Sequence, residues 1–247
     1  MPRAGIPNAD ARERTRRALL EAGLAILGDT PVEELLSQVT VKDVAKRAGL
    51  SPGAVYHYWD SQDDYRRALL ETILSTERFR ADGQVAAVVT AIRQATERAG
   101  ATSIRDSVHA GASKNFEMAA ANPASLQLQL SLWAKHDDET VRELLAGLYR
   151  SLNDDFMPLY EKVVADSGRQ FRSPFDARSL AVVLTALVEG LLIRHAVDQQ
   201  AVPAALTEVP RLLGEPEDPQ EGTWDLFAAA SYFIACGMTE PRPDAAE

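Results

Sequence analysis

The stretch SPGAVYHYW, from Ser51 to Trp59, gathers side chains that suit contact with a polyanion. Tyr56, His57 and Tyr58 follow one another, and each carries a hydrogen-bonding group on a ring. A phenol hydroxyl can reach a phosphate oxygen, and an imidazole can hydrogen bond to the edge of a base. The chemistry that this stretch predicts is therefore the recognition of nucleic acid.

A helical reading of the same stretch sorts its side chains onto two faces. Val55 and Trp59 lie one turn apart and point inward with Pro52 close by, whereas Gly53 and His57 lie opposite and face out. The flanks hold the rest, with Tyr56 on one side and Ala54 and Tyr58 on the other. A single packed cluster of rings is disfavoured, because a helix in so small a domain cannot bury its whole circumference. We therefore expect His57 at base edges and the two tyrosines at phosphates.

Two short helices must position this stretch. Helix 41–48 has Thr40 as its N-cap and Gly49 just past its end, and helix 52–59 has Ser51 as its N-cap. Two helices joined by such a tight turn form a helix-turn-helix, in which the second helix enters the major groove of DNA.

No other constellation in the sequence supports catalysis or metal binding. The run from His136 to Glu139 is rich in ligand types, but consecutive residues of a helix do not face one point, and acids at a helix start explain it better. No phosphate-binding loop, nucleophile elbow or zinc spacing is present. We therefore expect no enzyme activity, no cofactor and no metal.

The net charge of −10 is unevenly distributed along the chain. Residues 1–80 hold 12 basic and 12 acidic side chains, whereas residues 81–247 hold 14 and 24. Residues 1–17 carry five arginines against two acids. Because phosphate repels an acidic surface, any contact with DNA is expected from the N-terminal third.

Helical periodicity runs through the chain and predicts an all-α protein of two domains, residues 1–82 and 83–247. The expected helices span residues 10–27, 41–48, 52–59, 62–80, 84–98, 102–121, 123–136, 138–166, 176–200 and 223–237. Residues 125–133 alternate like a strand, but they also fit helical spacing, and helix is preferred. We expect a loop over 201–222 and a disordered tail after Thr239. The apolar run Leu180 to Ile193 is too short for a membrane span and predicts a deeply buried helix.

The segment from Thr40 to Leu70 resembles the DNA-binding signature of the tetracycline-repressor (TetR) family of transcriptional regulators. Its matching positions are Thr40, Val44-Ala45, Ala48-Gly49-Leu50-Ser51, Val55-Tyr56-His57-Tyr58-Trp59 and Asp60-Ser61-Gln62. With the preceding helix the likeness covers about a quarter of the chain. It implies an N-terminal three-helix helix-turn-helix domain and a C-terminal helical domain for ligand binding and dimerisation.

The resemblance also implies which residues meet DNA: Thr40, Lys42, Ser51, Pro52, Gly53, Ala54, Tyr56, His57, Tyr58 and the position of Gln62. Two positions depart from the family pattern. Gln62 stands where a phosphate-binding lysine is usual, and Tyr65 stands where leucine is usual. Arginines near the N-terminus could supply the missing phosphate contacts, unless they form only a solvated face: Arg12, Arg14, Arg16 and Arg17.

For the C-terminal domain the resemblance implies a homodimer and a pocket for a small molecule. Helices 176–200 and 223–237 are expected to form a four-helix bundle with the partner's copies. The pocket candidates are the aromatic and sulfur-containing residues of the middle helices, although plain core packing explains each of them as well: His109, Phe116, Met118, Trp133, His136, Tyr149, Phe156 and Tyr160. Because few charges lie among them, a small, largely apolar effector is expected, with Arg105 or Arg150 available to an acid.

The leading hypothesis is thus a cytoplasmic, ligand-responsive repressor that binds a palindromic operator as a homodimer and contacts no membrane. The cytoplasm is expected because the chain has a single cysteine, Cys236, and no apolar N-terminal segment. The alternatives are an all-helical enzyme or a protein-interaction adaptor with a vestigial helix-turn-helix.

Overall fold

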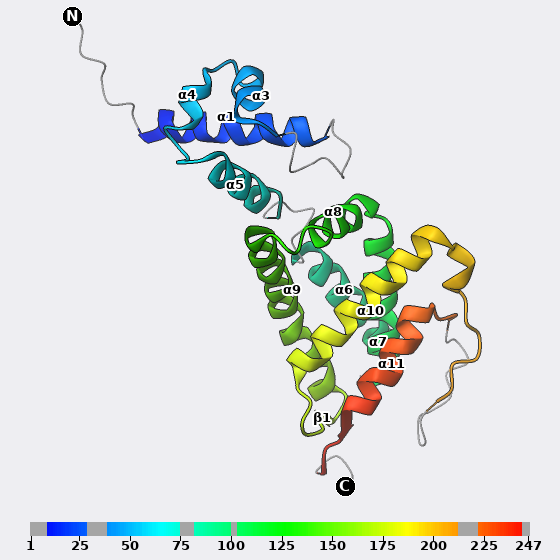
Figure 1. Cartoon of the computed structure of the whole chain (residues 1–247). Helices are drawn as coiled ribbons and strands as arrows, with labels where there is room; N and C mark the ends of the chain where they lie inside the picture. The colour runs from blue at the N-terminus through cyan, green and yellow to red at the C-terminus, as the bar shows by residue number, and fades with distance from the viewer. Residues whose placement is uncertain (1–8, 29–38, 75–81, 100–102, 212–221, 244–247) are drawn as a thin grey trace, which may run out of the picture. The chain divides into compact units, whose positions relative to one another are not determined.

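The computed structural model describes residues 9–28, 39–74, 82–99, 103–211 and 222–243, which are mostly helical (Figure 1). Internal packing divides the chain into two units. The first comprises residues 1–79 together with 127–146, and the second comprises 80–126 together with 147–247. The sequence-predicted boundary after residue 82 stays a prediction.

The first unit contains α1 (Ala9–Gly28), α3 (Val41–Arg47), α4 (Pro52–Val55) and α5 (Gln62–Leu74), which match the expected helices in order. Residues 75–81, over which the last of them was expected to continue, lie outside the described residues. The core of this unit is built from side chains that recur on one face of each helix: Leu19, Leu20, Val41, Val44, Ala45, Val55, Trp59, Tyr65 and Leu69.

Tyr65 is fully buried between α5 and α1, where the family pattern has leucine. Its hydroxyl donates a hydrogen bond of 2.8 Å to the carbonyl oxygen of Leu19. The extra length of the tyrosine fits because α1 carries Gly23 at the point of contact: a Cβ atom there would lie 2.2 Å from the tyrosine oxygen. The larger side chain on α5 is thus accommodated by the absence of a side chain at the facing position on α1.

The second unit contains most of the remaining helices: α6 (Asp82–Ala99), α7 (Ile104–Ala120), α10 (Ala177–Val197), the 3-10 turn η2 (Gln199–Ala201) and α11 (Leu226–Met238). The division between the units passes through α8 (Pro123–Trp133) and α9 (Glu139–Asp166). The helical reading of residues 125–133 is confirmed. In the second unit α7 packs against both α6 and α11.

A buried arginine stabilises the connection between α10 and α11. Arg105 is 3% exposed, and its guanidinium donates hydrogen bonds to the carbonyl oxygens of Val209 (2.8 Å) and Pro210 (3.1 Å). It also lies over the rings of Trp224 and Tyr232. These two hydrogen bonds give Arg105 a role within the fold, and the expectation that it could anchor an acidic ligand stays a prediction.

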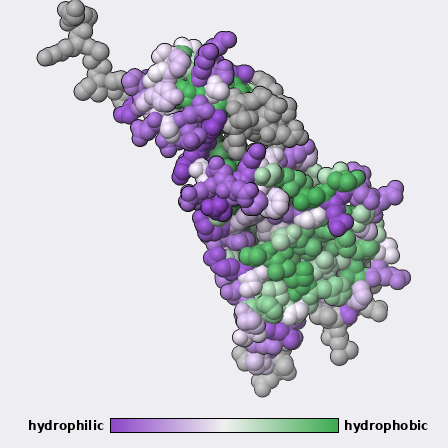
Figure 2. All heavy atoms as spheres, in the orientation of Figure 1, coloured by the Kyte–Doolittle hydropathy of each residue, from purple (hydrophilic) through white to green (hydrophobic). Residues whose placement is uncertain are grey.

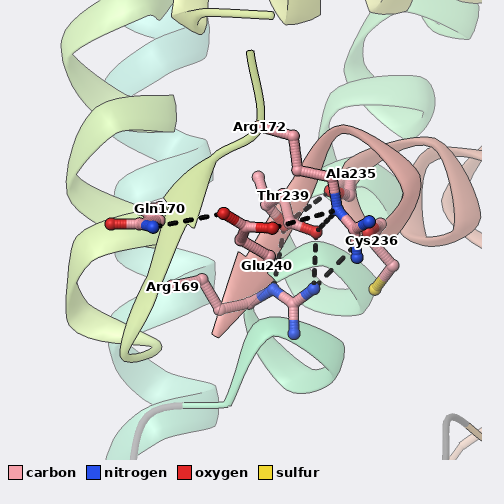
Figure 3. A network of polar contacts seen from close by, with 7 residues as sticks. All are labelled: Arg169, Gln170, Arg172, Ala235, Cys236, Thr239 and Glu240. Atoms are coloured by element: carbon pink, nitrogen blue, oxygen red, sulfur yellow. Dashed lines mark hydrogen bonds and ion pairs between the residues drawn. The ribbon is translucent and has the colours of Figure 1, made fainter. Parts of the chain in front are cut away.

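A two-stranded antiparallel sheet, which the sequence reading did not predict, holds the end of α11. Strand β1 (Arg169–Phe171) pairs with β2 (Thr239–Pro241), so the expectation of a disordered tail after Thr239 is wrong for residues 240–243, and residues 244–247 lie outside the described residues. Figure 3 shows Arg169 and Arg172 reaching this end of α11. Arg169 donates to the Thr239 hydroxyl at 2.8 Å and to the Thr239 carbonyl at 3.0 Å, and Arg172 donates to the same carbonyl at 2.9 Å. Two cations thus bind carbonyl groups where the helix leaves them unpaired.

The apolar helix α10 is buried along one side rather than all round. Among the described helices it is the one long and apolar enough to cross a membrane, yet only 22% of its most apolar 18-residue window is buried. The expectation of a deeply buried helix is therefore wrong for the single chain. The reason is its apolar second face, which includes Val182 at 50% exposure and Val197 at 87%.

Candidate nucleic-acid interface and effector cavity

The turn between α3 and α4 has the geometry that the sequence predicts. The Thr40 hydroxyl accepts a hydrogen bond from the Asp43 amide at 3.2 Å, which caps α3. Gly49 lies past the end of α3 with φ of 69°, a left-handed conformation that glycine adopts without strain. The Leu50 amide then donates to the Ala45 carbonyl at 2.8 Å and closes the helix end.

Ser51 occupies the N-cap position of α4 as predicted, but its side chain forms no capping hydrogen bond. Ser51 is exposed, so its hydroxyl is available for an external partner. Regular α4 is shorter than expected and ends at Val55, because the next amides bond three residues back: His57 donates to Ala54 at 3.3 Å and Tyr58 to Val55 at 2.9 Å. The chain stays coiled up to Trp59, although it is no longer an α-helix.

The side chains of this coil lie on the faces that the wheel predicts, with one exception. Val55 is fully buried and Trp59 is 7% exposed, whereas Tyr56 is 51% exposed and His57 is exposed as well. Tyr58 is half-buried because its ring contacts that of Trp59. The exception is Pro52, which is exposed rather than inward. Each residue that the family resemblance assigns to DNA is at least partly exposed, and all of them belong to the first unit: Thr40, Lys42, Ser51, Pro52, Gly53, Ala54, Tyr56, His57, Tyr58 and Gln62.

Two arginines of α1 lie against the second helix of the motif. The Arg12 guanidinium is 5.8 Å from the centre of the Tyr58 ring and donates a long hydrogen bond of 3.4 Å to the His57 carbonyl. Arg16 lies over the Trp59 ring at 5.5 Å. These contacts hold positive charge beside the tyrosine that is expected at phosphate, so Arg12 is well placed to replace the charge lost at Gln62.

The second unit contains a partly open cavity, which is lined by residues of α6, α7, α9, α10 and α11. The volume of the cavity that is open to the centre of a water-sized sphere is about 50 Å³. Its walls are almost wholly apolar: Val88, Ile92, Ser107, Val108, Gly111, Ala112, Asn115, Phe156, Leu159, Tyr160, Val163, Leu184 and Phe227. Such a chamber is of the kind that holds small, mainly apolar molecules.

The cavity exists because α7 presents small residues to it at intervals of one turn. Ser107, Gly111 and Asn115 are spaced by four and share a face. Ile92 of α6 packs so closely over Gly111 that an added Cβ atom would meet its terminal carbon at 2.9 Å. At Asn115 the side-chain oxygen accepts a hydrogen bond from the Gln84 amide. Both contacts fix α6 against α7 beside the open space.

Of the eight residues predicted to bind a ligand, the structure places some at the cavity and others away from it. Phe156 and Tyr160 line the cavity, and Phe116 packs behind its wall at 6.0 Å from Phe227. Of the other five, three lie elsewhere in the second unit: His109 stacks on Trp224, Met118 is half-buried on α7, and Tyr149 lies beside Glu189.

Trp133 and His136 stack on each other in the first unit and are exposed, Trp133 by 59%. Neither residue is among those that line the cavity. The sequence prediction, which considered aromatic and titratable side chains, did not include the small residues of α7. The four-residue spacing of Ser107, Gly111 and Asn115 was the one signal in the sequence that could have indicated them.

Glu189 is the main perturbed acid of the second unit. Burial raises the pKa of Glu189 from 4.5 to about 7, although hydrogen bonding to Tyr149 acts in the opposite direction. The pKa of the Tyr149 hydroxyl is raised in turn, first by burial and then by the Glu189 charge. Within the described segments, no three His, Cys, Asp or Glu side chains cluster as metal ligands would.

Comparison with known proteins matches both units. Residues 32–69 match the family of bacterial regulatory proteins of the tetR family, and residues 104–212 match the C-terminal domain of BetI-type transcriptional repressors. The HTH-type transcriptional regulator BetI of Agrobacterium fabrum is 27% identical over 217 residues, which is 87% of this chain and 92% of that protein. The nucleoid occlusion factor SlmA of Glaesserella parasuis is 27% identical over 189 residues, covering 76% of this chain and 84% of SlmA.

A solved structure gives the same fold. It is that of a Pseudomonas aeruginosa protein described as a transcriptional regulator, with a TM-score of 0.50 and 20% identity over 76% of this chain and 81% of that one. The family matches identify regulators rather than enzymes, and they agree with the helix-turn-helix geometry above. The chain therefore belongs to the TetR family of DNA-binding transcriptional regulators and carries a BetI-type C-terminal domain.

Proposed function

We propose that this regulator is a cytoplasmic homodimeric repressor, which binds a palindromic operator and is released from it by a small, largely apolar effector. The observation that carries the proposal is the apolar face that α10 and α11 leave exposed. A single helix-turn-helix reads too few base pairs for specificity, so two copies joined across a two-fold axis are needed.

The exposed apolar face is continuous over the two helices. Figure 2 shows hydrophobic side chains gathered over α10 and α11. Its large members are Val182, Val183, Ile193 and Val197 of α10 and Phe233 of α11, which are 38% to 87% exposed. Gly190 and Gly237 are also exposed and allow close approach of backbones. These features support a four-helix bundle made by two copies of the chain.

The contacts with DNA follow from the exposed side chains of the first unit. His57 faces out and is proposed to read a base edge, whereas Tyr56 and Tyr58 are proposed to bind phosphates on either side. Arg12, beside Tyr58, is proposed to add a charged phosphate contact. Half-sites are then expected about one helical turn apart, or a multiple of it.

Operator binding is tested by selecting bound fragments from random genomic DNA and mapping protection on them. We expect protection of palindromic sites, with affinity that falls steeply with salt. His57→Ala should relax preference among sequences, whereas Tyr56→Phe should weaken all sites alike. Protection without any inverted repeat would contradict the proposal, and identical behaviour of the two variants would contradict the assignment of the two faces.

Dimerisation is tested by placing a charge on the exposed apolar face. Val183→Asp should shift the sedimentation coefficient from dimer to monomer and weaken operator binding, because the buried carboxylates would lose their hydration. Thr90→Asp, on the exposed side of α6, is the matched control and should change neither. If Val183→Asp stayed dimeric, or if the wild-type chain partitioned into lipid vesicles instead, the face would have another partner.

A further inference from the structure

Among the residues that the structure describes, the side chains that line the cavity include no charged group. Apart from its hydrocarbon residues, the lining has three polar side chains, Ser107, Asn115 and Tyr160. Burial raises the pKa of the Tyr160 hydroxyl far above its ordinary value, so this side chain also stays neutral. A charged ligand would have to leave water without gaining a counter-ion here, which disfavours both carboxylates and organic cations.

Ser107 has an unused hydrogen-bonding group at the cavity wall. The residue is 1% exposed, and in the part of the chain that the structure describes its hydroxyl oxygen has no hydrogen-bond partner. Serines in helices often bond the carbonyl four residues back, but the Ser103 carbonyl receives only the Ser107 backbone amide, at 3.1 Å. A buried hydroxyl without a partner is uncommon in proteins and calls for an explanation such as a bound molecule.

The other two polar groups are less available. The Asn115 side-chain oxygen already accepts a hydrogen bond from Gln84, so part of its hydrogen-bonding capacity is used within the protein. Asn115 also lies two helical turns from Ser107, about 12 Å along α7. One small polar group therefore cannot bind both residues. Ser107 is the one of the two whose side chain has no hydrogen-bond partner among the described residues, so it is the group that a ligand would satisfy.

We propose that the effector is an uncharged molecule with a compact apolar body and one hydrogen-bonding group, which the Ser107 hydroxyl receives. This inference rests on the proposed function, since it names the chemical class that the cavity would take. The space of about 50 Å³ admits water molecules but is smaller than the roughly 150 Å³ that holds benzene in an engineered cavity. Binding therefore requires side chains to move, and Ile92, packed over Gly111, is the flexible part of the α6–α7 contact.

Four compounds of nearly equal size separate the contributions of shape, hydrogen bonding and charge. Phenol has the apolar ring and a hydroxyl, toluene lacks the hydroxyl, and benzoate and benzylammonium carry opposite charges. Their binding to the full-length protein is measured by calorimetry or by ligand-observed NMR. We expect phenol to bind about 5-fold more tightly than toluene, as one hydrogen bond allows, and the two ions not to bind measurably.

Ser107→Ala should abolish the preference of the protein for phenol over toluene. Ser113→Ala is the matched control, because Ser113 is on the same helix and its buried hydroxyl also lacks a partner among the described residues, but it is absent from the cavity lining. Thermal unfolding of each variant reports whether it is folded, and Ser107→Cys, which keeps the volume, replaces the alanine variant if that one does not fold.

The outcomes distinguish this inference from the proposed function. Failure of phenol to bind, binding of either ion as tightly as phenol, or an unchanged preference in Ser107→Ala would each overturn the proposed ligand class. Operator binding is measured on the same samples without ligand. If the protein binds a palindromic operator but shows no selectivity among the compounds, the repressor proposal stands and the ligand class is overturned. If the protein does not bind an operator, the repressor proposal is overturned whatever the compounds do.

Discussion

The packing of Gly23 against Tyr65 predicts that two substitutions will compensate for each other. Gly23→Ala alone would place a Cβ atom 2.2 Å from the Tyr65 oxygen and 3.0 Å from a methyl group of Leu69. The tyrosine ring would have to move and give up its 2.8 Å hydrogen bond to Leu19. Overpacking of this kind costs about 1–3 kcal/mol, against a gain of about 1 kcal/mol from the helix propensity of alanine. Because the lost hydrogen bond costs about 1 kcal/mol more, a net destabilisation of about 1–3 kcal/mol is expected.

Tyr65→Phe removes the oxygen that causes the clash. On its own this substitution should destabilise by about 1 kcal/mol, the worth of one buried hydrogen bond. In that background Gly23→Ala meets only the ends of the Leu69 side chain, which can rotate away, so it should be neutral or stabilising by up to about 1 kcal/mol. The double-mutant cycle should therefore show a coupling of about 2 kcal/mol.

The assay is amide hydrogen exchange in α1 and α5, followed by mass spectrometry. Exchange reports the opening free energy of these two helices alone. A global unfolding curve of a chain with two units would instead combine contributions from both units. The slowest amides of both helices give the four free energies of the cycle. If Gly23→Ala had the same effect in both backgrounds, within about 0.5 kcal/mol, the idea that glycine makes room for the tyrosine would be refuted.

Five further substitutions test three other parts of the structure. Because the raised pKa of Glu189 opposes ionisation, its penalty is absent below pH 4.5 and complete above about pH 7. Urea midpoints should therefore fall between about pH 4.5 and pH 7 in the wild type but not in Glu189→Gln. Arg169→Ala should lower the free energy of unfolding by about 1–2 kcal/mol in urea titrations, whereas the exposed Lys162→Ala should change it by less than about 0.5 kcal/mol. Ser51→Ala, which removes no capping bond, should weaken operator binding in fluorescence anisotropy with little loss of stability, while Thr40→Ala should also destabilise by about 1 kcal/mol.

Local signals in the sequence were enough to predict the helix-turn-helix. The cap at Thr40, the left-handed Gly49 and the inward pair Val55 and Trp59 each depend on a few neighbouring residues, and the structure places them as predicted. The end of α4 could not be predicted in the same way. A change from four-residue to three-residue hydrogen bonding after Val55 alters little in the spacing of apolar side chains, which is all that a helical wheel uses.

Features built from distant residues were missed for a different reason. Strands β1 and β2 have three residues each, and hydrogen bonds between them join positions 70 apart in sequence, so neither has a periodicity of its own. The cavity depends on the absence of a side chain at Gly111 of α7 and on how α6 and α9 pack around this position. The list of aromatic candidates therefore reached Phe156 and Tyr160 but not Ser107.

The grouping of residues 127–146 with residues 1–79 bears on how such regulators can be recombined. An exchange of DNA-binding modules between relatives is usually imagined as a single crossover near the end of the fourth helix. In this chain that crossover would separate Arg67 from Thr140 and Glu143, its partners at 3.1 and 3.6 Å within the same unit. A functional chimaera would instead have to inherit two separate stretches of the same parent. The specificity for DNA and residues 127–146, which include the end of α8 and the start of α9, are thus expected to have been inherited together.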